Sequence, residues 1–292
     1  MSELVVKFKD GRQLIFDAST LEDASKCLWY YKARNLDRWT SRVRPISAQW
    51  GTMLHSCLET YDQNLKFGHA DAVDASIDQA LKFGPELRES FDNTRTSRTL
   101  VRAVSYYTDL YREDPYVTAR HPDGTACIEV RFEFPIPNRP YRISGLIDRL
   151  AYERNNLFIV DRKTTSKTLN AQWWKQFLPG IQIPTYLLAT YWLGFKPKGA
   201  MIEGCQTMVN GCRWQRQTFE PTYDHLMEWQ VDMVALIDEI DHAHQTGHWP
   251  RRRTSCELHG GCTMRDVCNT APGQRHRPLN ERFHQVPYIP RA

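Results

Sequence analysis

Several features that would assign the chain to other protein classes are missing from its sequence. No uninterrupted apolar run approaches the roughly 18 residues of a membrane-spanning helix, and the start lacks the basic and apolar regions of a secretory signal. We therefore expect no membrane association and a cytoplasmic location. The pattern G-x-x-x-x-G-K-[ST] of an ATP-binding loop is also absent, so the chain is not itself a helicase. A net charge of only +4 is too small to imply nucleic-acid binding by itself.

What the sequence does contain favours a globular protein. Hydrophobic residues make up 41% and aromatic residues 12% of its 292 positions, which is enough for a packed core. Turn signals and composition divide the chain into four parts. These are an N-terminal hairpin and helix (1–50), a helical region (51–126), a central sheet region (127–220), and a C-terminal helix with a cysteine cluster and basic tail (221–292). We expect the four parts to form one integrated domain.

The order of the predicted elements is typical of an α/β fold. Apolar patterns predict strands at 127–134, 142–152, 157–163, 200–209 and 213–219. Helices are predicted within 51–112, with breaks near Gly68 and Gly84, and at 170–178, 182–193 and 222–245. Strands followed by helices and then strands predict a mixed central sheet flanked by helices.

Two local signals organise the N-terminal region. Asp10-Gly11 lies between the apolar runs 5–9 and 12–16, which predicts a β-hairpin. Ser19, with Glu22 three residues later, predicts a capping box at the start of a helix that carries Cys27.

The most informative segments are the two neighbouring strands that contain Asp148 and Asp161. The polar stretch 153–156 turns the chain back between them, so the strands are expected to pair as a hairpin. Alternation places Asp161 and Lys163 on the same face. Carboxylate oxygens hold Mg²⁺ or Mn²⁺, which activates a water and clamps a phosphate, and a nearby lysine stabilises the developing charge. The pattern predicts a nuclease metal site, although a D-x-K pair alone is also compatible with an ordinary exposed strand.

Two predicted helices offer further candidates for this site. His55 and Glu59 are four residues apart and share one helix face. Gln182 and Tyr186 are likewise separated by one helical turn. Each pair has a purely structural alternative, because a lone histidine on an apolar helix often serves packing, and polar residues often form the rim of a core helix.

The ordered set of motifs resembles a known family. G-x-x-x-H around His55, G-x-I-D ending at Asp148, D-x-K-T from Asp161 and Q-x-x-x-Y from Gln182 to Tyr186 are similar to the RecB-like branch of the PD-(D/E)XK nucleases. That branch includes the RecB and AddB nuclease domains and the CRISPR-associated RecB-like exonucleases. The resemblance spans about positions 19 to 268 and implies a restriction-endonuclease-like core. It implies that His55, Asp148, Asp161 and the Arg162 carbonyl ligate the metal, that Lys163 is the catalytic lysine, and that Gln182 and Tyr186 line the DNA path.

The chain has eight cysteines, and three of them are evenly spaced near its C-terminal end. Cys256, Cys262 and Cys268 occupy a segment with little apolar content, and Cys27 is the candidate fourth member. In relatives of the AddB and CRISPR-associated type such a set holds a [4Fe-4S] cluster, and the resemblance implies a cluster here that joins the N- and C-terminal segments. The chain departs from those relatives because it lacks their C-x-x-C step and has Leu28 where a proline is usual. Zn²⁺ remains an alternative, since four cysteines can bind either.

Basic residues are unevenly distributed, and one group near the N-terminus suits phosphates. Arg34, Arg38 and Arg42 alternate with aromatic residues that can stack on unpaired bases, which favours contact with DNA over an ordinary solvated surface. The sequence therefore predicts a metal-dependent deoxyribonuclease, most simply an exonuclease acting at DNA ends in a bacterial or phage-infected cell. Its metal is Mg²⁺ or Mn²⁺, with His55 favouring Mn²⁺. A recombination or helicase partner would supply unwinding. The alternative is a noncatalytic DNA-binding or assembly subunit with the same fold.

Overall fold

A computed structural model describes residues 15–43, 45–87, 92–178 and 180–287. The chain folds into two units. The terminal unit contains 1–44, 135–143 and 227–292, and the sheet unit contains 45–134 and 144–226. Most of the predicted N-terminal hairpin lies outside the described residues, and its last two, Ile15 and Phe16, form strand β1.

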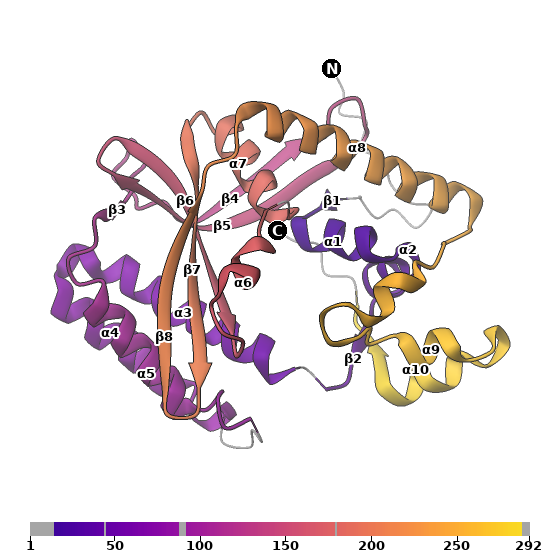
Figure 1. Ribbon diagram of the computed structural model, residues 1–292, viewed down its shortest axis with the longest axis horizontal. Helices are drawn as coiled ribbons and strands as arrows, with labels where there is room; N and C mark the ends of the chain where they lie inside the picture. The colour runs from indigo at the N-terminus through magenta and orange to yellow at the C-terminus, as the bar shows by residue number, and fades with distance from the viewer. Residues whose placement is uncertain (1–14, 44, 88–91, 179, 288–292) are drawn as a thin grey trace. The chain divides into compact units, whose positions relative to one another are not determined.

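A mixed sheet forms the centre of the sheet unit (Figure 1). Its strands are β3 (Tyr116–Thr118), β4 (Ile128–Pro135), β5 (Arg142–Glu153), β6 (Asn156–Thr165), β7 (Pro197–Met208) and β8 (Gly211–Phe219). The order is β5-β6-β7-β8, and β3 and β4 also pair with β5. The prediction of an α/β fold with a mixed sheet is confirmed, and the five predicted strands match β4 to β8 within a few residues.

The predicted hairpin is formed by β5 and β6, which pair antiparallel from Glu153 opposite Asn156 to Arg149 opposite Val160. Strand β6 pairs parallel with β7 from Leu157 to Thr165, with Arg162 opposite Glu203. A parallel pair needs a long crossover. The crossover contains α6 (Ala171–Lys175) and α7 (Gln182–Trp192), where two helices were predicted.

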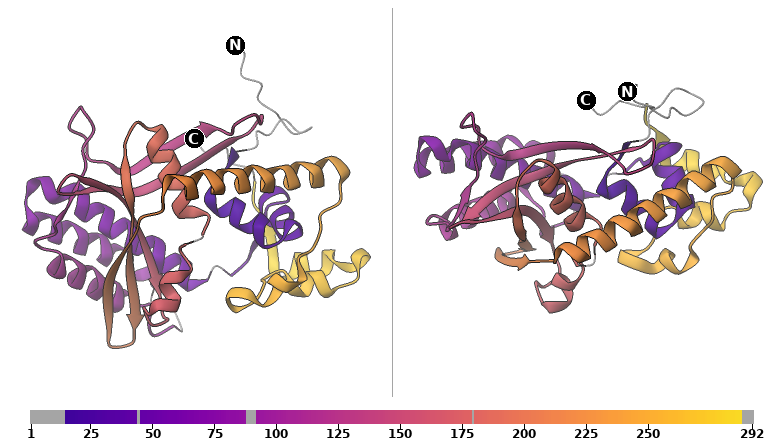
Figure 2. Two further views of the ribbon diagram at one scale, coloured as in Figure 1. Left: turned by 45° about the horizontal axis from the view of Figure 1, so that its top comes forward. Right: turned by 90° about the horizontal axis from the view of Figure 1, so that it is seen from above.

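Three helices pack together on the sheet and enclose a hydrophobic core with it (Figures 1 and 2). They are α3 (Ile46–Asn64), α4 (His69–Lys82) and α5 (Ser97–Leu110), with breaks at the predicted positions near Gly68 and Gly84. Trp50 of α3, Tyr107 of α5 and Trp214 of β8 belong to this core, so the helices are fixed to the sheet by large buried rings.

Beneath α3 and α5 the sheet carries a buried network of charged side chains. Asp62, Asp114 and Glu203 supply three carboxylates, and the network also contains three arginines, which are Arg149, Arg162 and Arg216. The charges balance, which is the condition under which buried ion pairs are tolerated. Burial acts to raise the pKa of Glu203, but Arg162, Arg216 and Arg149 outweigh it and lower this pKa from 4.5 to about 2.

Replacing Glu203 by glutamine should therefore destabilise the protein in a pH-dependent way. The folded-state pKa lies below the unfolded value, so the carboxylate stabilises the fold above about pH 4.5 and loses this contribution as the pH falls toward 2. We expect Glu203→Gln to lower the free energy of unfolding by about 3 kcal/mol at neutral pH. Urea denaturation should show the difference from wild type falling to less than half by about pH 3. An equal loss at every pH would contradict the assignment.

The terminal unit consists of helices and two short strand pairings. Its elements are β1 (Ile15–Phe16), α1 (Ala18–Lys26), α2 (Leu28–Tyr31), a π-helical turn (Lys32–Leu36), β2 (Trp39–Ser41), most of α8 (Tyr223–Thr246), a 3₁₀ segment (Arg253–Gly260), α9 (Arg265–Asn269), a 3₁₀ turn (Pro272–Gln274), α10 (His276–Arg282) and β9 (Phe283–Gln285). Strand β1 pairs parallel with the start of β5, and β2 pairs antiparallel with β9. The second pairing joins the N- and C-terminal segments directly.

The predicted start of the first helix is wrong by two residues. The N-cap is Asp17, whose side chain accepts a hydrogen bond from the Thr20 amide at 2.8 Å, and the Thr20 hydroxyl accepts one from the Asp17 amide at 2.8 Å. A carboxylate is a strong cap, so the reciprocal pair forms here instead of at Ser19 and Glu22. Helix α1 ends at Lys26, which places Cys27 at the junction between α1 and α2 and not inside a helix.

Candidate active site

Asp148 and Asp161 lie on adjacent strands at the end of the paired part of the β5–β6 hairpin. The β5 and β6 backbones pair as far as Arg149 opposite Val160. Just beyond that pair, the Asp148 carboxylate accepts a hydrogen bond from the Arg162 amide at 2.9 Å. This contact fixes the stagger that the two strands need for their acidic side chains to converge. Asp161 is almost fully buried and Asp148 is partly buried.

Lys163 and Gln182 hold the Asp161 carboxylate from two sides. Lys163 Nζ lies 2.6 Å from Asp161 Oδ2, and Gln182 Nε2 donates to Asp161 Oδ1 at 3.0 Å. The Gln182 amide also lies 3.1 Å from the Tyr186 hydroxyl, one helical turn along α7. The structure thus brings together Asp161, Lys163, Gln182 and Tyr186, four of the residues that the sequence marked.

His55, on α3, lies beside the Asp148 carboxylate. Its Nδ1 lies 3.3 Å from Asp148 Oδ2, and its side chain keeps partial access to solvent. The helix can approach the sheet here because Gly51 has no Cβ, which would lie only 3.2 Å from Thr164 Oγ1 of β6. Gly51 therefore has a steric role in the G-x-x-x-H motif.

A second motif glycine, Gly145 of β5, leaves room for two aromatic rings. A Cβ on Gly145 would lie 2.5 Å from Phe132 Cζ and 3.3 Å from a ring carbon of Tyr186. The glycine leaves room for both rings, and their packing helps to hold the Tyr186 side chain beside Gln182. The G-x-I-D motif thus combines a close approach with a site carboxylate.

The electrostatics of the site favour a cation. Burial raises the pKa of Asp161, the neighbouring Lys163 and His55 lower it, and the negative charge of Asp148 raises it; the net effect is an increase. Burial also raises the pKa of Tyr186, so this hydroxyl keeps its proton at neutral pH. Two carboxylates that repel each other in a dry environment are stabilised in their charged forms when a positive charge lies between them.

The donor set suits a hard divalent cation. Two carboxylates and one imidazole from three different elements point to one place, and such ligands suit Mg²⁺ or Mn²⁺. Within the described ranges, however, no three His, Cys, Asp or Glu side chains are already close enough to form a complete metal site. The fit therefore rests on the chemistry of the donors and on the charge that they concentrate.

Comparison with known proteins decides the family. The model of the PD-(D/E)XK nuclease superfamily matches residues 16–269, most of the chain. The protein belongs to the PD-(D/E)XK nuclease superfamily. This confirms the superfamily that the motifs predicted, and it identifies the chain as a nuclease by family. No curated protein matches it.

Solved structures add a likeness in fold to this PD-(D/E)XK nuclease. One is described as "Putative exonuclease" from Eubacterium rectale, with a TM-score of 0.52, 16% identity, and coverage of 94% of this chain and 90% of that one. A second, SSO0001, has a TM-score of 0.35 and 12% identity, covering 77% of this chain and 96% of that one.

One acidic residue beside the site of this nuclease was not predicted. Burial raises the pKa of Glu129 to about 7, and the charges of Asp148 and Glu59 add to the increase. Its backbone has a φ of 51°, which is unusual for a side chain other than glycine. Alternation along β4 would have placed Glu129 with the exposed residues Arg131 and Glu133. The positive φ breaks that alternation, and no signal in the local sequence indicates it.

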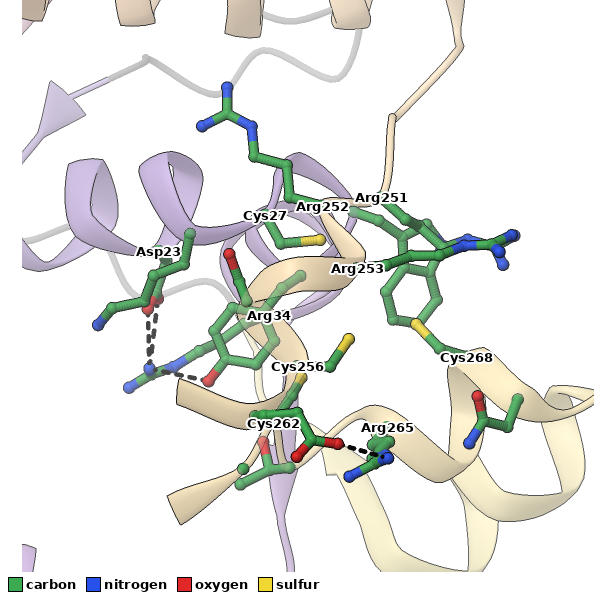
Figure 3. A pocket seen from close by; sticks show the side chains of 18 residues that line it. Asp23, Cys27, Arg34, Arg251, Arg252, Arg253, Cys256, Cys262, Arg265 and Cys268 are labelled. Atoms are coloured by element: carbon green, nitrogen blue, oxygen red, sulfur yellow. Dashed lines mark hydrogen bonds and ion pairs between the residues drawn. The ribbon is translucent and has the colours of Figure 1, made fainter. Parts of the chain in front are cut away.

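The four predicted cluster cysteines all line one cavity of about 580 Å³ in the terminal unit (Figure 3). Cys27 comes from the junction after α1, and Cys256, Cys262 and Cys268 come from the C-terminal segment. Burial raises the pKa of Cys268 to about 11, and the neighbouring Cys27 and Cys262 thiols also raise it. The thiols are gathered around a shared space, although they are not in ligating contact in the described part of the chain.

The three arginines predicted to bind DNA lie in the terminal unit of this nuclease, whereas the carboxylate site lies in the sheet unit. Arg34 pairs with Asp23 at 3.2 Å and lines the cysteine cavity, and Arg42 donates to the Asn280 carbonyl at 3.1 Å. Arg38 has a φ of 64°. Arg34 and Arg42 thus also have structural partners. None of the helices described is long and apolar enough to cross a membrane.

Proposed function

We propose that the protein is a metal-dependent deoxyribonuclease of the RecB-like branch that degrades DNA from its ends. The observation that carries the proposal is the convergence of Asp148, Asp161 and Lys163 from two strands, with His55 beside them. Membership of the nuclease superfamily supports hydrolysis of nucleic acid. The "Putative exonuclease" with a similar fold is consistent with action at DNA ends.

The residues have distinct roles in this proposal. His55, Asp148, Asp161 and the Arg162 carbonyl would hold Mg²⁺ or Mn²⁺. The ion supplies an activated water and neutralises charge on the scissile phosphate. Lys163 carries a positive charge at the same place and stabilises the charge that develops on the phosphate oxygens. Gln182 orients the Asp161 carboxylate, and Tyr186, which keeps its proton, offers a hydrogen bond to the DNA strand.

The terminal unit is proposed to hold a [4Fe-4S] cluster between Cys27, Cys256, Cys262 and Cys268. The support is that these four thiols line one cavity although Cys27 is more than two hundred positions from the others in the sequence. The same cavity is lined by six basic residues, which are Lys26, Arg34, Arg251, Arg252, Arg253 and Arg265. These cations would balance a negatively charged cluster and could also receive phosphates of a DNA strand, together with Arg38 and Arg42. A helicase or recombination partner would deliver the strand, and the cell interior is the expected location.

A panel of DNA substrates tests the proposal. Wild-type protein with Mn²⁺ or Mg²⁺ should degrade end-labelled linear DNA and leave closed circular DNA intact. Asp161→Ala should bind the same DNA without cutting it, because the variant keeps the fold but loses a carboxylate ligand. Cutting of circles by the wild type would indicate an endonuclease. Binding without any cutting by the wild type would instead support the noncatalytic assembly role.

A further inference from the structure

Three separate elements carry the proposed metal ligands, so something must hold these elements in mutual register. His55 is on α3, Asp148 on β5 and Asp161 on β6. A metal site needs its donors placed to within a fraction of an ångström, and groups behind the ligands usually provide this precision. The buried charge network lies behind this site. One of its members, Asp62 of α3, pairs with Arg149 of β5 and with Arg162 of β6.

Asp62 lies on α3, seven residues after His55. Seven residues are nearly two helical turns, so the two side chains leave the helix on the same side. The Asp62 carboxylate has no solvent exposure, and it bridges two arginines. Its Oδ1 lies 3.1 Å from Arg149 NH1, and its Oδ2 lies 2.6 Å from Arg162 NH2.

The two arginines that Asp62 bridges are the sequence neighbours of the two proposed carboxylate ligands. Arg149 directly follows Asp148, and Arg162 directly follows Asp161, so both strands contain the dipeptide Asp-Arg at the site. Both arginines reach the Asp62 carboxylate of α3, and His55 of the same helix lies beside Asp148. A bond from Asp62 to each arginine therefore fixes each strand at the residue next to its ligand.

Arg162 also acts through its backbone. Its amide donates to Asp148 Oδ2 at 2.9 Å, and its carbonyl is the proposed fourth ligand. Its guanidinium is buried and donates to Asp62 of α3 and to Glu203 of β7, and the bond to Asp62 is the one that ties Arg162 to the helix that carries His55.

We propose that Asp62 is a positioning residue that ties His55, Asp148 and Asp161 into one metal-binding geometry. This inference rests on the proposed function, because it assumes that these three residues bind a divalent ion. The energetic reason is that a buried charge is screened little, so the bonds to Arg149 and Arg162 hold α3 and both strands at fixed distances.

A purely structural role for Asp62 makes a different prediction, and the network offers the control. Glu203 is equally buried and also neutralises Arg162, but it lies on β7 and its other partners are Arg216 and Tyr107. Removing the charge of Glu203 therefore disturbs the same network but leaves the bond between Asp62 of α3 and Arg149 of β5 in place. Asp62→Asn and Glu203→Gln form a matched pair of charge-removing substitutions.

Calorimetric titration of the full-length protein with Mn²⁺ separates the two roles, because it reports the dissociation constant and the number of competent sites independently. We expect Asp62→Asn to weaken Mn²⁺ binding by about 10- to 100-fold, as is typical when a partner of a metal ligand is removed. Glu203→Gln should keep the wild-type dissociation constant. In cleavage assays, excess Mn²⁺ should restore the kcat of Asp62→Asn, and its KM for DNA should not change.

A second variant covers the case in which Asp62→Asn does not fold. Arg149→Met breaks the bridge from the β5 side and leaves Asp62 paired with Arg162, and it too should weaken Mn²⁺ binding. Fewer binding sites with an unchanged dissociation constant in these variants would show a structural role and overturn the inference. An equal loss of affinity in Glu203→Gln would also overturn it. If the wild type bound no Mn²⁺ and cut no DNA, the proposed function itself would fail, which is a distinct result.

Discussion

Replacing Lys163 by methionine should reduce kcat for DNA cleavage by about 100- to 1,000-fold, the usual effect of removing one group that stabilises charge in a transition state. Lys163 Nζ lies 2.6 Å from Asp161 Oδ2, in a place where burial already penalises negative charge. The lysine thus supplies its charge where water screens it little. The measurement is the cleavage rate at saturating DNA and metal, corrected for the folded fraction seen by circular dichroism.

The metal dependence of Lys163→Met should distinguish a catalytic lysine from a structural one. Methionine leaves the Asp161 carboxylate free of a competing ammonium, so Mn²⁺ affinity should be kept or improved while kcat falls. Lys163→Arg retains the positive charge but cannot give up a proton, and it should recover part of the lost rate if charge alone is needed. Lys167→Met, at an exposed position on the same segment, is the control and should cleave like the wild type. Full activity in Lys163→Met would refute the proposed role.

Much of the site could be predicted from local sequence because its residues lie on regular elements. A two-residue period placed Asp161 and Lys163 on one face, and a four-residue spacing placed Gln182 and Tyr186 on one helix face. The structure brings all four together. The superfamily followed from the order of the motifs, and the mixed sheet followed from the alternation of strands and helices.

What the sequence could not show depends on contacts between distant segments or on local competition. The bridge from Asp62 spans 87 positions to Arg149 and 100 positions to Arg162, and no local pattern encodes such a pairing. Glu129 escaped prediction because a positive φ breaks the alternation of its strand. The first helix cap was misplaced because Asp17 competes successfully with Ser19 for the role.

Replacing Cys268 by serine should abolish iron binding and unfold the C-terminal part of the terminal unit. This segment has little else to hold it. Of the described side chains between Arg251 and Pro287, only Met264, Val267 and Phe283 are buried, and they form a small core with Ala33. A core of this size contributes far less than the order of 10 kcal/mol that a structural metal can add to folding.

Three readouts should move together in Cys268→Ser. The visible absorbance of an iron-sulfur chromophore and the bound iron should disappear, and limited proteolysis should cut within 251–287, where the wild type resists. Cys212→Ser is the matched control, because Cys212 packs against the helical core of the sheet unit and does not line the cavity. It should retain its iron and its resistance to protease.

The comparison also separates iron from zinc, because both metals would connect Cys27 to the C-terminal segment but only one is coloured. A colourless wild type with one zinc per chain would replace the cluster by zinc and leave the connecting role intact. Undiminished iron in Cys268→Ser would exclude this cysteine as a ligand. The β2–β9 pairing already joins the two segments, so resistance to protease without any metal would show that this strand pairing and the small core are sufficient.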